Sequence, residues 1–439
     1  MNIFRELAQE LSDWAAATHR KPLILRGARQ TGKSYLVESL LKKHFRKILS
    51  VNFEKEAAFR NCFRESLSPT EIIPKLEILL REKIVPGETL LFFDELQDCP
   101  EAITGLRYFY EELPALHVIG AGSLLEFALG TTSFPVGRVS VRYVYPLTFR
   151  EFLFASSEMP FLDVLDNHNY DQPFPQAIHQ HGLKLLQQYL MIGGMPASVR
   201  TYLETKNFND CQQILEDMLE LYKADFPKYA ERKTELEAIA SIFLRISQLV
   251  CQQLKYVNIS RDLRQEVIKA CIALLDKARV ITRILPTHAI PLAINAKDYP
   301  QKLLFLDVGL MQRAAGFPLE TWVKSQDFFT HNGQIAEQFV GQELLSLSSK
   351  QRPKLYYWNR IKRGSSAEVD YLIHTNAGIL PIEVKSGASG KLRSLKLFLE
   401  MNKNIQSGIK VSAENCRIEH NIRTIPLYAF SSWFKKHYL

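Results

Sequence analysis

Residues 27–34 read GARQTGKS, which fits the phosphate-binding pattern G-x-x-x-x-G-K-[ST] at every position. An apolar run, residues 22–25, precedes the stretch, and residues 35–41 after it read as a helix. A phosphate-binding loop requires this strand–loop–helix context. Its glycines let the backbone curl so that N–H groups face phosphate oxygens, and the helix N-terminus adds partial positive charge. The stretch therefore predicts a nucleotide-binding site.

Two side chains of this loop have specific predicted roles. Lys33 would reach the β- and γ-phosphates of ATP, and Ser34 would hold Mg²⁺. The residues expected to contact the nucleotide are Gly27, Ala28, Arg29, Gln30, Thr31, Gly32, Lys33, Ser34 and Tyr35.

The length and composition predict a soluble, cytoplasmic protein of several domains. At 439 residues the chain is too long for one core, and it is 46% hydrophobic and 23% charged, as globular proteins are. It contains no apolar run long enough to cross a membrane, and its N-terminus lacks the layout of a signal peptide. Its 6 scattered cysteines include no C-x-x-C pair, which argues against a disulfide framework or a zinc site.

The net charge of +8 is unevenly placed along the chain. Residues 331–439 contain 16 Lys and Arg against 8 Asp and Glu, whereas residues 1–330 contain 39 of each kind. A basic excess confined to one terminal part predicts a polyanionic partner there, with DNA as the candidate. The alternative is a basic domain whose charge serves only solubility.

A second stretch supplies the other half of a nucleotide site. Residues 89–95, TLLFFDE, form an apolar run that ends in two acids. Such a run is typical of a buried parallel strand that delivers its carboxylates to the edge of the sheet where ligands bind. Asp94 would hold the Mg²⁺ shell, and Glu95 would orient and deprotonate the attacking water.

Further strands are predicted at residues 47–53 and 116–120, with a helix at residues 102–113 between the third and fourth strands of the series. The alternation of strands and helices predicts an α/β fold with a doubly wound parallel sheet.

These motifs together resemble the AAA+ ATPases. The matching pieces are GARQTGKS, LLFFDELQ and VIGAGSLL, followed by Gly137-Arg138 and by YPLTFREF at residues 145–152. The resemblance implies that Ser123, after the fourth strand, senses the γ-phosphate and that Asn52, on the second strand, restrains Glu95. It also implies a homo-oligomer in which an arginine of one subunit completes the neighbour's site.

Arg138 is the candidate for this trans-acting arginine, and Arg142 is its competitor. The alternative for Arg138 is a structural arginine without a role at phosphate.

The order of motifs also resembles a narrower group, ATPases of the AAA_14 type joined to a C-terminal domain of unknown function. Its marks are PLTFREFL, YLMIGGMP at residues 189–196 and LFLDVGL at residues 304–310. The predicted organisation is an ATPase domain at residues 1–155, a linker and helical lid region at 156–205, a winged-helix-like domain at 206–330 and a nuclease-like domain at 331–439.

The middle of the chain is predicted to be helical after a polar start. Residues 156–181 are rich in Asn, Asp, His, Gln and Pro, which favours a surface insertion or linker. Residues 208–285 show helical periodicity and end in a strand at 279–285, the order of a winged helix. Arg261, Arg264 and Lys269 would then contact DNA phosphates. The alternative is a winged helix that packs subunits together.

A second chemistry is predicted near the C-terminus. A helix at residues 332–345 precedes three strands; Asp370 lies on the second of them, and Glu383 and Lys385 lie on the third, two residues apart and so on one face. Asp370 and Glu383 would bind Mg²⁺ or Mn²⁺, which activates water, and Lys385 would help to position the nucleophile. Glu337 on the helix would give a further carboxylate.

This constellation resembles the PD-(D/E)xK nuclease superfamily, although Val369 stands where that pattern has proline. The resemblance implies a restriction-endonuclease-like α/β domain and metal-dependent DNA cleavage. The alternative is a degenerate nuclease fold kept for DNA binding or assembly. A cluster of nearby side chains favours nucleic acid under either alternative: Trp358, Arg360, Lys362 and Arg363.

Two functions of different classes therefore follow from the sequence. The first is an AAA+ ATPase that couples ATP hydrolysis to DNA binding or remodelling, with DNA cleavage by the C-terminal domain as an added activity. The second is an ATP-operated regulatory switch whose C-terminal domain binds a protein partner without catalysis. A small-molecule kinase has no visible acceptor site in the sequence.

Overall fold

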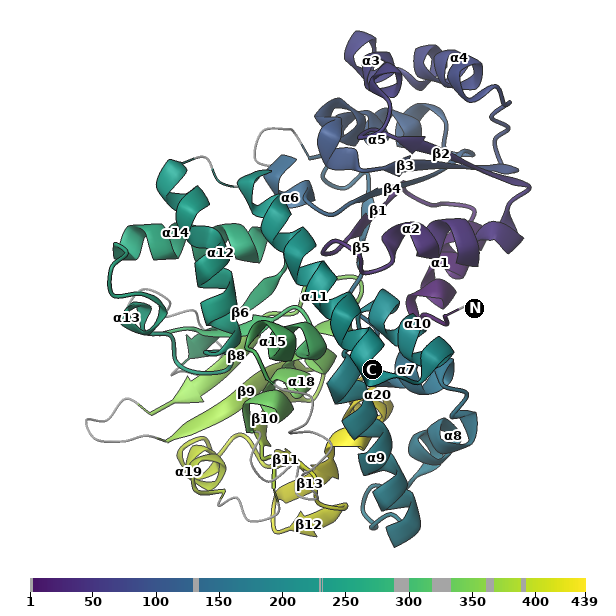
Figure 1. Ribbon diagram of the computed structural model, residues 1–439. Coiled ribbons are helices and arrows are strands. Elements are labelled where there is room, and N and C mark those ends of the chain that lie inside the picture. The colour runs from purple at the N-terminus through teal and green to yellow at the C-terminus, as the bar shows by residue number, and fades with distance from the viewer. Residues whose placement is uncertain are drawn as a thin grey trace. The chain divides into compact units, whose positions relative to one another are not determined.

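The computed structural model describes residues 3–128, 134–228, 230, 232–287, 300–317, 333–360, 367–387 and 392–439 (Figure 1). Its contacts divide the chain into two compact units. The first unit comprises Met1–Pro146, Lys277–Arg279 and Ser348–Arg352, and the second comprises Leu147–Asp276, Val280–Leu347 and Pro353–Leu439. This division differs from the four segments expected from the sequence.

The first unit is built on a parallel sheet, as the sequence predicts, and the sheet has five strands. Its strands are β1 (Leu23–Arg26), β2 (Lys47–Asn52), β3 (Thr89–Asp94), β4 (His117–Gly122) and β5 (Ser140–Tyr143). They lie in the order β2-β3-β4-β1-β5, and every neighbouring pair is parallel. The strand that leads into GARQTGKS thus lies inside the sheet, next to β4.

Helices cover both faces of this sheet. They are α1 (Leu7–Ala16), α2 (Lys33–Tyr35), η1 (Leu36–Leu40), η2 (Lys42–His44), α3 (Ala57–Glu65), α4 (Pro69–Leu80), η3 (Leu96–Asp98), α5 (Pro100–Glu112) and α6 (Leu125–Ala128). Side chains of β3 alternate between two cores: Leu91 and Phe93 pack in one, Leu90 and Phe92 in the other. Burial on both faces explains why the strand is apolar throughout.

The second unit contains an eight-stranded mixed sheet. Its strands are β6 (Ile281–Thr287), β7 (Lys302–Phe305), β8 (Leu355–Asn359), β9 (Glu368–Thr375), β10 (Gly378–Val384), β11 (Gly408–Ser412), β12 (Arg417–Glu419) and β13 (Ile422–Pro426). The order is β12-β13-β11-β10-β9-β8-β6-β7. The three strands predicted around Asp370 and Glu383 are present as β8, β9 and β10.

The helices of the second unit precede, interrupt and follow its strands. They are α7 (Phe149–Ala155), α8 (Met159–Asn167), α9 (Gln176–Ile192), α10 (Pro196–Thr205), α11 (Phe208–Asp225), η4 (Phe226–Lys228), α12 (Lys233–Ser247), α13 (Tyr256–Ile259), α14 (Gln265–Lys277), α15 (Val308–Ala314), α18 (Gly333–Ser346), α19 (Arg393–Met401), η5 (Leu427–Ala429) and α20 (Phe430–Tyr438).

Two predictions for the middle of the chain are wrong. The strand expected as a wing is β6, which pairs with β7 on one side and with β8 on the other, so it belongs to the large sheet and forms no separate winged helix. The expected linker at residues 156–181 instead contains α8, whose Phe161, Leu162 and Leu165 are buried. In both places long-range packing overrides a local composition signal.

The sequence predicts no disulfide framework and no segment that crosses a membrane. Cysteines 62, 99, 211, 251, 271 and 416 are all free and buried. Within the described ranges, no helix is long and apolar enough to cross a membrane.

A buried carboxylate joins two sequence motifs of the second unit. Asp307 has 0% of its surface exposed, and it accepts hydrogen bonds from the backbone N–H groups of Gly194 at 2.6 Å, Gly309 at 2.9 Å and Leu310 at 3.0 Å. Gly193 ends α9 with a left-handed φ of 71°, and a Cβ there would lie 2.1 Å from Asp307 Oδ1. The glycines of GGMP therefore end a helix and permit close packing.

The same junction extends to the first residue of the second unit. The N–H of Leu147 donates to the carbonyl oxygen of Gly194 at 2.6 Å, and the Tyr189 hydroxyl donates to the carbonyl oxygen of Leu147 at 2.6 Å. Gln342 on α18 donates to the Tyr189 hydroxyl and accepts from the Val308 N–H, each at 2.9 Å. Segments that are distant in sequence are thus held by one buried network.

We expect Asp307→Ala to destabilise the protein because three buried N–H groups would lose their acceptor. Each unsatisfied group costs about 1–3 kcal/mol, so the three groups together predict a loss of at least about 3 kcal/mol in the free energy of unfolding. Asn207→Ala removes an exposed N-cap that accepts from the Asn209 N–H, and it should cost only about 1 kcal/mol. Urea unfolding of both variants measures the difference; equal losses would contradict the role assigned to Asp307.

Candidate functional site

The loop of residues 27–34 runs between β1 and α2 with the backbone shape of an anion-binding turn. Gly32 has φ 91° and Gln30 has φ 61°, both in the left-handed region. A Cβ on Gly27 would lie 2.2 Å from the carbonyl oxygen of Val144, so only glycine fits there. Both glycines of the pattern are therefore required by geometry that can be seen in the loop.

Lys33 is buried within this loop and is held by backbone carbonyls. Its Nζ donates to the carbonyl oxygens of Gly27 at 3.1 Å and Ala28 at 2.8 Å. Burial lowers the pKa of Lys33 to about 8, while the nearby charges of Glu95 and Asp94 act in the opposite direction. A cation in this position is partly desolvated and suited to an anionic ligand.

Ser34 and Asp94 lie together across the loop and the end of β3. The Ser34 hydroxyl donates to Asp94 Oδ2 at 3.1 Å. Burial, and then the charge of Glu95, raises the pKa of Asp94. A hydroxyl and a carboxylate are the oxygen ligands that Mg²⁺ accepts beside a nucleotide phosphate. The donor set therefore fits Mg²⁺, with Ser34 and Asp94 as the residues that would hold it.

Glu95 follows Asp94 in a strained backbone conformation. Its φ of 53° lies in the left-handed region, which costs a non-glycine residue about 1–3 kcal/mol and is most often found at functional sites. Gln97 Nε2 donates to Glu95 Oε2 at 2.7 Å and so fixes the direction of the carboxylate. Gln97 is a positioning residue that spacing alone did not single out, although it belongs to the quoted LLFFDELQ stretch.

The predicted residues of neighbouring strands reach the same edge of the sheet. Asn52 is level with Asp94 in the pairing of β2 with β3, and Gly122 is level with Arg26, so Ser123 follows where the loop begins. Ser123 is 2% exposed, and its hydroxyl has no hydrogen-bond partner within the described part of the chain. A buried hydroxyl without a partner at this edge is compatible with the predicted contact to phosphate.

Arg5 braces the loop from the N-terminal segment. Its guanidinium donates to the carbonyl oxygen of Thr31 at 2.9 Å and to that of Tyr145 at 2.7 Å, and only 4% of the residue is exposed. Tyr35, which is also expected to contact nucleotide, exchanges hydrogen bonds with the backbone of Ile3 through its hydroxyl. The N-terminal segment thus supports the loop, which no sequence motif indicated.

Neither candidate for the trans-acting arginine reaches the loop within one chain. The Arg138 side chain is 47% exposed and pairs with Glu111 at 2.7 Å. The Arg142 side chain is 18% exposed and pairs with Glu10 at 2.8 Å. Exposure favours Arg138 as the residue free to meet a neighbouring subunit, and its role remains a prediction.

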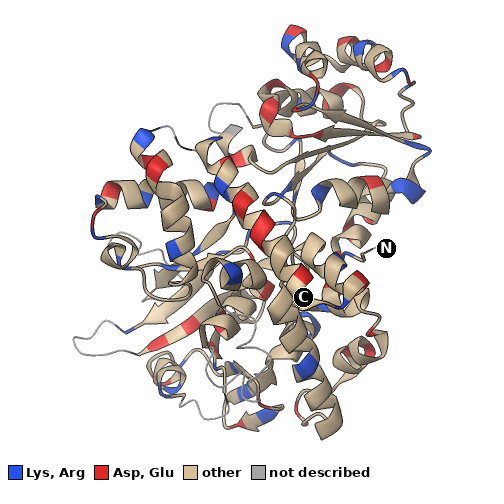
Figure 2. Cartoon of the chain, viewed as in Figure 1, with Lys and Arg blue, Asp and Glu red and all other residues tan. Residues whose placement is uncertain are grey.

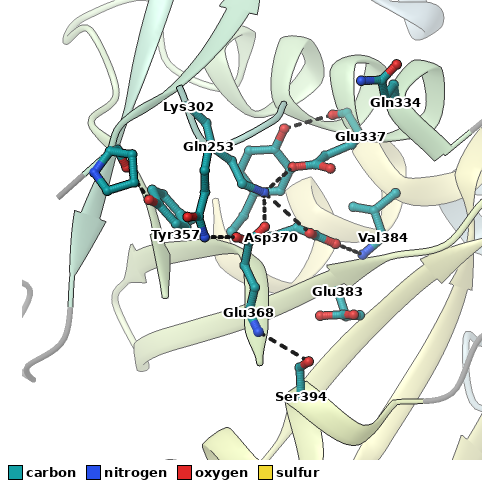
Figure 3. Close-up of polar contacts among 12 residues, drawn as sticks. Gln253, Lys302, Gln334, Glu337, Tyr357, Glu368, Asp370, Glu383, Val384 and Ser394 are labelled. Carbon is teal, nitrogen blue, oxygen red and sulfur yellow. Dashed lines mark hydrogen bonds and ion pairs between the residues drawn. The ribbon is translucent and has the colours of Figure 1, made fainter. Parts of the chain in front are cut away.

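The predicted C-terminal residues form a second cluster of charged groups, centred on a lysine (Figure 3). Lys302, at the start of β7, is 1% exposed. Its Nζ lies 2.8 Å from Glu337 Oε1 and 3.7 Å from Asp370 Oδ1, and it also contacts Glu368. Lys302 and Glu368 were not singled out from the sequence, because neither belongs to the D…E-x-K spacing.

Glu383 and Lys385 form a pair beside this group. Lys385 Nζ donates to Glu383 Oε1 at 2.5 Å, as expected for residues two apart on one face. Asp370 Oδ2 accepts from the Val384 N–H at 2.8 Å, which joins β9 to the end of β10. The structure therefore brings Glu337, Asp370, Glu383 and Lys385 into one neighbourhood.

The carboxylates of this cluster are strongly perturbed. Burial first, and the charge of Asp370 second, raise the pKa of Glu337 to about 8 and that of Glu383 to about 8. Burial by itself would lower the pKa of Lys302. The charges of Glu337, Asp370 and Glu368 outweigh this effect and raise the pKa of the lysine well above its usual value. Among the described residues, no three His, Cys, Asp or Glu side chains are arranged to hold a metal ion.

Comparison with known proteins assigns a class to the first unit. A family profile described as an AAA domain matches residues 19–153. Two profiles described as domains of unknown function, DUF8612 and DUF4143, match residues 183–321 and 332–430. The AAA match spans the loop, the Asp94–Glu95 pair and Ser123. The first unit is therefore an AAA-type P-loop ATPase domain, and the chain is an ATPase that uses ATP and, as this class usually does, Mg²⁺.

Individual relatives are distant. The uncharacterized protein MJ1544 of Methanocaldococcus jannaschii is 22% identical over 392 residues, which cover 87% of this chain and 79% of that protein. The Walker-type ATPase PABY2304 of Pyrococcus abyssi is 17% identical, with 71% of this chain and 96% of that chain covered and a TM-score of 0.45. The RuvB Holliday junction branch migration motor of Thermotoga maritima is 15% identical, with coverages of 64% and 90% and a TM-score of 0.31.

We expect Glu95→Gln to reduce ATP hydrolysis by roughly 100- to 10,000-fold, because the amide cannot take a proton from water. ATP binding should be retained, since the loop and Lys33 are unchanged. Glu88→Gln is the matched control, because Glu88 directly precedes β3, at the end opposite Glu95, and is exposed. Phosphate release measures ATP hydrolysis, and nucleotide titration measures ATP binding. Normal turnover by Glu95→Gln would contradict the catalytic role assigned to Glu95.

We also expect ATP affinity to fall as the pH rises above about 8. The pKa of Lys33 is lowered to about 8 in the free protein, and ATP selects the protonated ammonium. Above that value each pH unit should weaken binding by up to roughly tenfold. Titration of labelled ATP between pH 7 and 9.5, with folding checked at each pH, measures the effect. A constant affinity over this range would contradict the lowered pKa.

Proposed function

We propose that this ATPase couples ATP turnover to the binding or remodelling of DNA. The observation that carries the proposal is the charge distribution, because the whole net charge of +8 falls in residues 331–439. A local basic excess attracts a polyanion through its phosphates and makes the affinity depend steeply on salt.

Exposed basic side chains lie beside the acidic cluster of the second unit. Arg393 and Lys396 on α19, and Lys403 beyond its end, are exposed. Ser394, between the first two, accepts a hydrogen bond from the N–H of Glu368 at 3.2 Å, so α19 adjoins the strand that carries Asp370. Figure 2 marks the Lys and Arg residues in blue. DNA held by these side chains would run next to the cluster.

Other side chains expected to contact nucleic acid have mixed outcomes. Arg261, Arg264 and Lys269 are exposed at the start of α14 and can reach phosphate without a wing. Trp358 is 4% exposed and packs edge-on against Phe398, so it is a core residue that cannot stack on a base. Lys362 and Arg363 lie outside the described residues.

ATP hydrolysis would take place between copies of the chain. Arg138 is exposed in the first unit and would complete a neighbour's site, which supports a homo-oligomer. Measurement of the mass in solution with ATP tests this part, and a chain that stays monomeric at every concentration would contradict it.

We expect the triple variant Arg393→Ser, Lys396→Ser and Lys403→Ser to bind DNA more weakly. Each lost phosphate contact should reduce the slope of log affinity against log salt by about 1, without changing sequence preference. Fluorescence anisotropy with a labelled duplex at several salt concentrations measures both quantities.

The matched control carries three serine replacements in the ATPase unit, at the exposed residues Lys42, Lys43 and Lys83. It removes the same charge, so it separates a local contact from a general loss of positive charge. Equal weakening by the two triple variants would contradict a DNA contact at α19, and no binding by the unmodified chain would contradict the DNA proposal as a whole.

Cleavage of DNA is the finer form of this hypothesis. A restriction-endonuclease-like domain at residues 331–439 would use Asp370, Glu383 and Lys385 with Mg²⁺ or Mn²⁺, and Asp370→Ala would abolish nicking of supercoiled plasmid. One observation favours the second candidate, a non-catalytic C-terminal domain in an ATP-operated switch: Lys302 occupies the centre of the acids. Nicking by the unmodified chain that Asp370→Ala removes would exclude that candidate.

A further inference from the structure

The acidic cluster of the second unit already contains a cation of its own. Lys302 enters from β7 with 1% of its surface exposed, and its ammonium contacts Glu337 from α18 and both Glu368 and Asp370 from β9 (Figure 3). The ring of Tyr357 on β8 lies under it, with the ring centroid 5.2 Å from Nζ. Acids and an aromatic face thus surround one nitrogen atom.

We propose that the ammonium of Lys302 is the resident cation of this site and takes the place that a metal ion would need. The chain would then hold no Mg²⁺ or Mn²⁺ at Glu337, Glu368 and Asp370. This inference concerns the second unit alone and does not depend on whether the protein binds DNA. It favours the non-catalytic C-terminal domain over metal-dependent cleavage.

The geometry leaves no position that could hold both the ammonium of Lys302 and a metal ion. Mg²⁺ requires near-octahedral oxygen ligands at about 2.0–2.1 Å, and it draws the carboxylates of a site toward a single point. At this site the Lys302 nitrogen is at that point, 2.8 Å from Glu337 Oε1. A metal ion could bind the same three acids only if the buried ammonium moved away and lost these partners.

Other donors engage further oxygens of these residues. Glu368 Oε2 accepts from Gln253 Nε2 at 2.7 Å, and Asp370 Oδ2 accepts from the Val384 N–H at 2.8 Å. The carbonyl oxygen of Glu337 accepts from the Tyr371 hydroxyl at 2.8 Å. These contacts help to hold the acids around the ammonium.

A second lysine adds positive charge beside this group. Lys385 contacts Glu383 Oε1, so the four acids of the neighbourhood face two ammonium groups. Glu383 Oε2 is buried and has no hydrogen-bond partner in the described part of the chain. An added cation could still dock at this oxygen, so the experiment must examine it directly.

Manganese binding by the full-length chain tests the proposal. Asp94→Asn serves as the background and nucleotide is omitted, because both steps remove the metal of the ATPase site. Bound Mn²⁺ is counted by electron paramagnetic resonance, and the melting temperature is measured with and without Mn²⁺. We expect the background chain to bind no Mn²⁺ and to melt at the same temperature under both conditions.

Lys302→Met in that background should gain one Mn²⁺ per chain and a higher melting temperature in its presence, and Asp370→Asn should abolish both gains. Because Lys302→Met leaves three acids without their counter-charge, it is paired with the double variant Lys302→Met, Glu368→Gln, which removes one acid with the lysine. Lys410→Met is the control: Lys410 is 3% exposed and paired with Glu414 at 2.9 Å, and its loss should create no Mn²⁺ site.

Two results would overturn the proposal. The first is a background chain that already binds Mn²⁺ and loses it on Asp370→Asn or Glu383→Gln, which would place a metal beside Lys302. The second is a folded double variant that gains no Mn²⁺, which would mean that the lysine does not occupy a metal-binding position. If both lysine variants fail to fold, absence of Mn²⁺ from the background chain still supports the proposal and its presence still defeats it.

Discussion

The carboxylate of Asp307 is the interaction on which the second unit depends. Its oxygens accept hydrogen bonds from three backbone N–H groups, two from the first turn of α15 and one from the turn that ends α9. Buried N–H groups must find acceptors, so this residue fixes where α9 stops and where α15 begins. Because Leu147 bonds to the same turn through Gly194, the first residue after the ATPase unit is held by this network as well.

The nucleotide site could be predicted because its parts are local in sequence. GARQTGKS contains the loop, the lysine and the hydroxyl within eight residues. The apolar run that ends in Asp94 and Glu95 by itself predicts a buried strand whose carboxylates lie at the ligand-binding edge of the sheet. In the same way, the alternation of side chains along a strand predicts that Glu383 and Lys385, which are two residues apart, lie on one face. In each case, a rule about neighbours in the chain is sufficient to bring the chemical groups together.

The remainder depends on partners that are far away in the chain. The pairing of β6 with β8 joins residues about seventy positions apart, and no local pattern distinguishes it from a wing. Lys302 begins an apolar stretch, and a single lysine at a strand end ordinarily reaches solvent. Its burial depends on acids supplied by α18 and β9, which become neighbours only in the folded sheet. For the same reason Arg5 was not predicted, because it contacts Thr31 and Tyr145. Gln97 differs, because it lies only two residues from the Glu95 that it contacts.

Two buried lysines show how surroundings decide what each site can accept. Lys33 is held by neutral carbonyl oxygens, and burial lowers its pKa to about 8, so an anionic phosphate would relieve its desolvation. Lys302 is surrounded by carboxylates that raise its pKa well above the usual value, so its charge is already matched. A buried cation held only by neutral groups attracts an anionic ligand. A buried cation that is surrounded by carboxylates instead excludes a second cation from them. The same side chain therefore makes the first site receptive to nucleotide and closes the second to metal.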